Sequence, residues 1–200
     1  MYVIIQTSMQ KINLESPQSI GFIDPNVLRR FHHSLDPSIG NFVTASATLI
    51  SDRVEVTVGN SRAARAFIYE FWKKVIELEV QKTEAPIIYM NAMRKILPPR
   101  STTIESASMW HTDSRRYAVS RGLGTEFLRG DLSVPENTII RSVGSMLRSP
   151  TFEPTADNLF IPDDGEIMAF DTGNFHRSAI NKTDHIIDRL FVQAIVMGVG

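Results

Sequence analysis

The chain has 200 residues, of which 42% are hydrophobic and 22% are charged, and its formal net charge is −1. This length suits a single domain with a real hydrophobic core, and the composition is that of an ordinary globular protein. The near-neutral charge provides no field that would favour nucleic acid or an anionic membrane, so we expect the protein to bind neither.

The chain contains no cysteine. That excludes disulfide bonds, thiolate metal ligands and cysteine nucleophiles, and it fits a reducing compartment. The first residues lack a basic flank followed by a long apolar segment, so no signal peptide is expected. No apolar run approaches the length of a membrane helix. These features together predict a cytoplasmic protein.

The first part of the chain predicts two helices and one strand. Residues 24–35 should form a short helix, because Asp24 can cap its N-terminus and Pro25 suits its first turn. The run "RVEVTV" alternates polar and apolar residues, which is typical of a strand. Residues 61–81 carry apolar residues at helical spacing, which predicts a helix with one buried stripe. His32 and His33, on the first helix, are expected to be exposed.

Short β-like runs dominate the rest of the chain and are separated by glycine, proline, asparagine and aspartate. They are "APIIYMNAMRKIL", "TTIESASMW", "RRYAVSRG", "TEFLRG", "NTIIRSVG", "GEIMAF" and "DRLFVQAIVMG". Strands at this spacing favour a jelly roll. We therefore expect one α+β domain over residues 1–200, with a helical or mixed part at 1–85 packed against a jelly-roll metal-binding core at 86–200.

The segment "WHTD" places His111 and Asp113 two positions apart. In a strand these side chains point to the same face, where an imidazole and a carboxylate make a partial site for a divalent metal. The same pair is also compatible with a plain surface contact or with the His–Asp couple of a hydrolase. A hydrolase reading lacks a convincing nucleophile, because no strained glycine elbow surrounds the nearby Ser108.

A second segment, "GEIMAFDTGNFHRSAIN", supplies a further histidine, His176, after a strand and a turn. Several strands separate it from the first pair, so it can return beside them in a jelly roll. Two histidines and one carboxylate form the facial triad of non-haem Fe(II) oxygenases, which leaves positions open for a co-substrate and O₂. We predict His111, Asp113 and His176 as metal ligands and catalytic centre. His185 is the competing alternative to His176, but it lies in a polar turn and is expected to be exposed.

If 2-oxoglutarate is the co-substrate at such an iron site, three further residues are candidates for binding it. Arg189 opens the last strand, and its guanidinium can bind a carboxylate through two parallel hydrogen bonds. Arg177 competes for this role but ranks second, because in a strand it faces away from His176. The hydroxyl of Tyr117 is a candidate hydrogen-bond donor, although a structural tyrosine explains that position equally well.

The order H-T-D, then "GEIMAFDTGNFHRSAIN", then "DRLFVQAIV" resembles the Fe(II)/2-oxoglutarate-dependent dioxygenase superfamily. The distal segment is similar to the pattern of phytanoyl-CoA and prolyl hydroxylases. The resemblance covers roughly residues 88–198 and implies a double-stranded β-helix. By that pattern His111, Asp113 and His176 match the metal ligands, and Arg189 matches the residue that holds the co-substrate.

The resemblance implies an enzyme that couples the oxidative decarboxylation of 2-oxoglutarate to the oxidation of an unactivated C–H bond. A small molecule, such as an amino acid or a natural-product intermediate, is the expected substrate, and a peptide side chain is the next candidate. The alternative is a cupin-like jelly roll that binds a metal or ligand without oxygenase activity. Arg189 separates the two, because a non-oxygenase has no need of a carboxylate-binding group at that position.

Overall fold

Ten strands, two α-helices and one short 3-10 helix make up the described part of this computed structural model. The structure describes residues 17–37, 43–50, 53–57, 62–79, 86–100, 116–128, 155–170 and 174–198. No helix in this described part is both long and apolar enough to cross a membrane.

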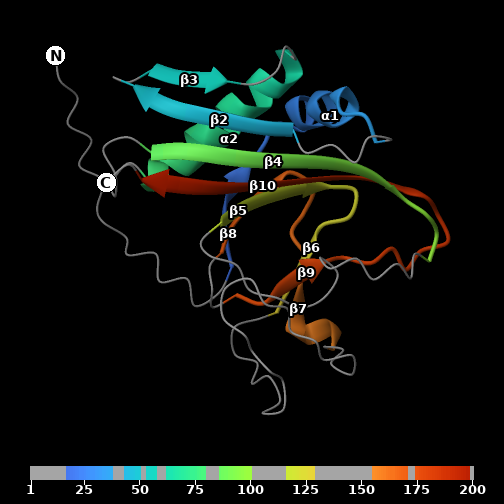
Figure 1. Cartoon of the computed structure of the whole chain (residues 1–200). Coiled ribbons are helices and arrows are strands. Elements are labelled where there is room, and N and C mark those ends of the chain that lie inside the picture. Colours follow the sequence, from blue (N-terminus) through green and yellow to red (C-terminus); the bar gives the residue numbers. More distant parts are fainter. Residues whose placement is uncertain are drawn as a thin grey trace.

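Seven of these strands form one antiparallel sheet, which crosses the middle of the molecule in Figure 1. Its strands, in spatial order, are β1 (Gln18–Phe22), β8 (Glu166–Phe170), β5 (Arg116–Arg121), β10 (Ile187–Gly198), β4 (Pro86–Leu97), β2 (Val43–Ile50) and β3 (Arg53–Thr57). The N-terminal part therefore adds three strands to the sheet that the C-terminal part builds. The runs predicted from Arg53, at 86–97, at 116–121, at 166–170 and at 187–198 are confirmed as strands.

A second, three-stranded antiparallel sheet lies on the other side of the large sheet from the helices (Figure 1). It consists of β7 (Leu159–Phe160), β6 (Thr125–Leu128) and β9 (His176–Ser178), and the 3-10 helix η2 (Ala156–Asn158) precedes β7. Two antiparallel sheets with few helices confirm the α+β class. The finer assignment, a complete double-stranded β-helix, stays a prediction.

Both predicted helices are confirmed and cover one face of the large sheet. In α1 (Pro25–Ser34) the Asp24 carboxylate accepts hydrogen bonds from the backbone N–H groups of Asn26 and Val27, which satisfies two otherwise unbonded donors. In α2 (Arg62–Glu79) the predicted apolar stripe is buried against the sheet. Its buried members are Ala64, Phe67, Ile68, Phe71, Trp72 and Val75.

Strand β10 shows how the large sheet separates two environments. Its residues Leu190, Val192 and Ala194 belong to the core under the helices. Phe191, between them, packs against a different apolar cluster on the opposite face. Because successive side chains of a strand alternate between faces, Arg189 shares the face of Phe191, which is the face toward the small sheet.

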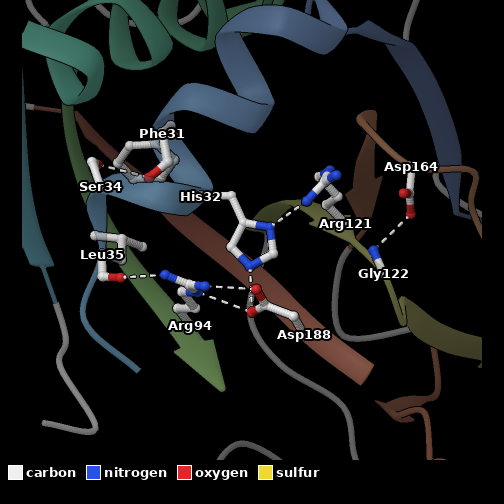
Figure 2. A network of polar contacts seen from close by, with 9 residues as sticks. All are labelled: Phe31, His32, Ser34, Leu35, Arg94, Arg121, Gly122, Asp164 and Asp188. Atoms are coloured by element: carbon white, nitrogen blue, oxygen red, sulfur yellow. Dashed lines mark hydrogen bonds and ion pairs between the residues drawn. The ribbon is translucent and has the colours of Figure 1, made fainter. Parts of the chain in front are cut away.

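The expectation that His32 is exposed is wrong. This residue is 0% exposed, and Figure 2 shows it projecting from α1 between Arg121 and Asp188. Nδ1 of His32 lies 2.7 Å from the Arg121 guanidinium, and Nε2 lies 2.9 Å from Oδ1 of Asp188. A guanidinium can only donate, so Nδ1 must be the acceptor and Nε2 must carry the proton. The native imidazole is therefore neutral.

The same carboxylate also anchors strand β4. Arg94 donates from Nε and Nη2 to the two oxygens of Asp188, at 2.9 and 2.7 Å, and from Nη1 to the carbonyl of Leu35. The hydrogen bond from Arg94 lowers the pKa of Asp188, with a smaller contribution from His32. This network, formed by His32, Arg94, Arg121 and Asp188, joins α1 to three strands of the sheet (Figure 2).

Acidification should therefore destabilise the protein through His32. Burial is the main cause that lowers the pKa of His32 below 6.5, and the Arg121 and Arg94 charges add to it while Asp188 opposes them. Below pH 6.5 the unfolded chain takes up a proton that the native imidazole does not, so stability falls by up to about 1.4 kcal/mol per pH unit. Urea unfolding between pH 8 and pH 5 measures this loss.

The substitution His32→Gln should reduce that pH dependence, because glutamine does not titrate. His33→Gln is the matched control, since His33 is the exposed neighbour on the same helix. Asp188 does not contribute in this window, because its lowered pKa places its loss of charge below 3.8. If the free energy of unfolding of His32→Gln falls as steeply with decreasing pH as that of wild type, the buried imidazole is not the source of the pH dependence.

Candidate functional site

Apolar side chains from both sheets meet between them and form the floor of the candidate site. The buried members of this inter-sheet cluster are Ala118, Phe127, Met168 and Phe170, with Phe160 and Phe191 packed against them. The cluster draws on β5, β8 and β10 of the large sheet and on β6 and β7 of the small one. It provides a water-poor environment in which polar contacts are stronger than in solution.

His176 enters this cluster from the small sheet. It lies opposite Phe127 in the register of β9 and β6, and its ring centroid is 5.7 Å from that of Phe127 and 4.6 Å from that of Phe170. Only 4% of the residue is exposed. Two aromatic contacts and the polar contact described next thus fix the orientation of the imidazole.

The polar contact also sets the tautomer of His176. Nδ1 lies 3.1 Å from the carbonyl oxygen of Asn174. A carbonyl can only accept, so Nδ1 carries a proton, and the neutral form of the ring has its lone pair on Nε2. Metal-ligating histidines commonly donate their other ring N–H to a backbone carbonyl in this way. The arrangement suits Nε2 as a metal ligand.

Arg189 enters the inter-sheet space from the large sheet. It is 4% exposed, and its guanidinium carbon lies 5.3 Å from the ring centroid of Phe191. Its one hydrogen bond within the described part is from Nη2 to the carbonyl of Gly124, at 3.3 Å, while its Nε is buried without a partner among the described residues. Burial lowers the pKa of Arg189 to about 10, so the group remains a cation at neutral pH.

The turn between β5 and β6 places the carbonyl that Arg189 contacts. Gly122 has a φ of +89°, and a Cβ there would lie 2.6 Å from the carbonyl oxygen of Asp188. The close approach therefore requires glycine at this position. The Gly124 carbonyl also accepts the backbone N–H of Ala179, just after β9. One turn thus connects the strand that carries Arg189 with the strand that carries His176.

Two of the three predicted metal ligands, His111 and Asp113, lie outside the described residues. Within the described part, no three histidine, aspartate or glutamate side chains gather to hold a metal ion. That finding leaves the predicted triad untested, because only His176 belongs to the described part. His185, the competing ligand, is exposed in a turn, as expected.

Tyr117 is not brought together with His176 and Arg189. It is fully buried in the core under the helices, whereas its neighbour Ala118 belongs to the inter-sheet cluster. The sheet itself separates the hydroxyl-bearing ring from any ligand between the sheets. The placement therefore favours the structural alternative for Tyr117 over a contact with the co-substrate. Strand alternation alone could not tell which face of β5 was which.

Arg177 already has a carboxylate partner that the sequence did not indicate. Its Nε donates to Glu126 Oε2 at 2.5 Å, and both residues are 4% exposed. The two are opposite each other in the register of β9 and β6, on the face away from His176 and Phe127. From the sequence, Arg177 is second to Arg189 as a co-substrate ligand because this orientation is expected. Its position matches a structural ion pair better than a co-substrate contact.

Comparison with known proteins gives only distant structural likenesses. No protein-family model matches the chain, and no curated protein matches it. IDO from Bacillus thuringiensis matches with a TM-score of 0.49 at 10% identity, over 88% of this chain and 83% of that protein. The Fe(II)/(alpha)ketoglutarate-dependent dioxygenase TqaL matches with a TM-score of 0.45 at 11% identity, over 86% and 74% respectively.

A prolyl-4-hydroxylase from Pseudomonas putida also resembles the chain, with a TM-score of 0.39 at 11% identity over 92% of each protein. At these identities none of the three likenesses assigns a residue, a substrate or a reaction. All three TM-scores lie below 0.5, so the likenesses carry no conclusion about the activity of this chain.

Proposed function

We propose that the chain is an Fe(II)- and 2-oxoglutarate-dependent dioxygenase built on a double-stranded β-helix. The observation that carries this proposal is Arg189, a buried cation for which no carboxylate of the described residues forms an ion pair. A buried charge is costly unless it is paired, so such a group favours an anionic ligand. It lies in the same inter-sheet space as His176.

The predicted ligand set fits ferrous iron. Imidazole and carboxylate donors suit ferrous iron, and no thiolate ligand is needed. His176 offers Nε2 in the required tautomer, and His111 and Asp113 would complete the triad. When bound, the metal would supply the oxidative chemistry that couples decarboxylation of 2-oxoglutarate to oxidation of a C–H bond.

The protein's own residues would bind, orient and shield the reactants. Arg189 would hold the carboxylate of 2-oxoglutarate that is remote from the metal, by charge-assisted hydrogen bonds. The aromatic rings of Phe127 and Phe170 would fix the His176 imidazole and exclude water. The near-neutral chain favours a small molecule as substrate, such as an amino acid or a natural-product intermediate, over nucleic acid.

The proposed triad places one condition on how the alternation of side chains in β5 continues toward residue 111. Even-numbered positions of β5, such as Ala118, face the inter-sheet cluster, and odd-numbered positions, such as Tyr117, face the helices. An unbroken strand extended back to residue 111 would point His111 and Asp113 toward the helices. The triad therefore requires a break in the alternation before Arg116, where β5 begins.

Anaerobic titration with Fe(II) and 2-oxoglutarate tests the proposed function. We expect a weak visible charge-transfer band from the chelate in wild type and its loss in Asp113→Ala, which removes one ligand. His185→Ala is the matched control, because His185 is exposed, and it should keep the band. Absence of the band in wild type would overturn the proposal. Succinate release screened over candidate amino acids and natural-product intermediates then addresses the substrate.

A further inference from the structure

The buried network of Figure 2 ends at the turn between β5 and β6. Nδ1 of His32 accepts a hydrogen bond from Arg121, the last residue of β5, and Gly122 of the turn follows directly. The backbone carbonyl of Asp188, whose carboxylate is the other partner of His32, leaves no room for a side chain at Gly122. The two residues that contact the imidazole therefore also border this turn.

The turn positions two elements of the candidate site on the other side of the large sheet. The carbonyl of Gly124 accepts a hydrogen bond from the Arg189 guanidinium at 3.3 Å and one from the backbone N–H of Ala179 at 3.2 Å. Arg121 connects the start of the turn to α1 through His32. A change at His32 thus reaches the inter-sheet space through Arg121 and the turn.

A proton on His32 reverses one of its two contacts. In the neutral ring, Nδ1 accepts from Arg121 at 2.7 Å and Nε2 lies 2.9 Å from the Asp188 carboxylate, to which it donates. The protonated ring carries two N–H donors and a positive charge, so it keeps Asp188 but repels Arg121. Burial lowers the pKa of His32, so protonation goes together with opening of its surroundings.

The described charged groups that face His32 lie on the strands beneath it and on its own helix. They are Asp188 of β10, Arg121 of β5, Arg94 of β4, which binds the same Asp188 carboxylate, and His33 of α1, whose ring stacks on His32 with centroids 5.5 Å apart. On α2, Glu70 accepts the backbone N–H of Asp24 instead, and Lys74 lies near Gly21. The other described charged side chains around the two helices are exposed, namely Arg29, Arg30, Asp36, Arg62, Arg65 and Lys73.

We propose that His32 is a proton-controlled positioning residue for the inter-sheet site. While neutral, it holds Arg121 and the β5–β6 turn in place. On acidification it takes up a proton at Nδ1, releases Arg121 and loosens the turn, which lowers the affinity of the site for its anionic ligand. The step from the turn to the ligand rests on the proposed function, whereas the step from His32 to the turn does not.

Hydrogen exchange of single backbone amides tests the first step. It is measured by NMR on the full chain between pH 8 and pH 5 and corrected for the intrinsic exchange rate. Protection of the Gly122 and Ala179 amides, which are both bonded at the turn, should fall by up to about tenfold for each pH unit below 6.5, because opening takes up one proton. The Leu128 amide, bonded to the carbonyl of Phe175 in the small sheet, is the internal control and should keep its protection.

Two variants assign the effect to the contact between His32 and Arg121. His32→Gln should make protection at the turn independent of pH, and the exposed neighbour gives the matched control, His33→Gln, which should behave as wild type. In Arg121→Met a proton on His32 meets no second cation at Nδ1 and strengthens the contact with Asp188. Protection at the turn should then be low at every pH and should no longer fall with acid.

Wild type alone can overturn the switch. It fails if the amides of Gly122, Ala179 and Leu128 lose protection together, since that is global unfolding, or if none of them loses protection. It also fails if His32→Gln or Arg121→Met retains the wild-type fall at the turn.

Binding of 2-oxoglutarate to the Fe(II)-loaded protein tests the second step. Below pH 6.5 the affinity should fall more steeply in wild type than in His32→Gln, by up to about tenfold for each pH unit. An equal fall in both overturns the link from the turn to the ligand and leaves the dioxygenase supported. Loss of turn protection that depends on His32, in a protein that shows no charge-transfer band at any pH, supports the switch and overturns the dioxygenase.

Discussion

Replacing Arg189 with methionine is expected to abolish 2-oxoglutarate binding and, at the same time, to stabilise the ligand-free protein. The affinity should fall by at least about a hundredfold, because two charge-assisted hydrogen bonds to a carboxylate are lost. The free energy of unfolding should rise by about 1–2 kcal/mol, since a buried cation without a described carboxylate partner gives way to an apolar side chain of similar length.

Arg94→Met is the matched control for the two expected effects of Arg189→Met, weaker 2-oxoglutarate binding and higher stability. Arg94, on the helix side, forms an ion pair with Asp188. Its loss leaves the Leu35 carbonyl and the Asp188 carboxylate without the hydrogen bonds that Arg94 donates. We expect it to destabilise the protein by about 2–3 kcal/mol and to leave the 2-oxoglutarate affinity intact. If Arg189→Met destabilises the protein as Arg94→Met does, the Arg189 guanidinium is a structural group.

The pH dependence of binding offers a second measurement on Arg189. Burial lowers its pKa to about 10, so the guanidinium should keep its charge at neutral pH and begin to lose it as the pH rises toward 10. The affinity of wild type for 2-oxoglutarate should decline over the same range. An exposed arginine would show no such decline, because it keeps its charge throughout this pH range.

The helices could be predicted because their signals are local. The Asp24 cap and the following proline define the start of α1 within a few residues. The apolar stripe of α2 appears in the sequence as a helical period. By contrast, β1 was not predicted, because "QSIGF" is short and contains a glycine at a φ of +129°. Strand β2 was also missed, although "VTASATLI" does alternate polar and apolar residues.

The candidate site depends on contacts that sequence spacing does not contain. His32 is buried because Asp188 and Arg121, which are distant in the sequence, converge on it. Tyr117 faces the helices because the period of a strand defines two faces without saying which one meets the core. The prediction that Arg177 faces away from His176 needed only alternation, and the structure agrees with it. That Glu126 is the partner of Arg177 depends on the register of β6 and β9, which no local sequence pattern predicts.

The buried pair of Arg177 and Glu126 carries the largest expected effect on stability. Arg177→Met should lower the free energy of unfolding by about 3–5 kcal/mol, because it leaves the Glu126 carboxylate buried without its cation. Chemical denaturation measures the loss. Glu126→Gln should also destabilise, since it leaves the guanidinium facing a neutral amide.

The double replacement of Arg177 by methionine and Glu126 by leucine distinguishes a lost interaction from a lost ligand site. Both charges then leave the buried position together, so much of the stability should return, because replacing a whole buried ion pair with apolar side chains is often neutral or favourable. At a temperature where it is folded, the double variant should bind 2-oxoglutarate nearly as wild type does. A loss of affinity comparable to that of Arg189→Met would instead place Arg177 at the co-substrate carboxylate. Arg177 would then have to leave Glu126, on the face of β6 and β9 away from His176, to reach the ligand, and the register that places the two residues opposite each other disfavours this.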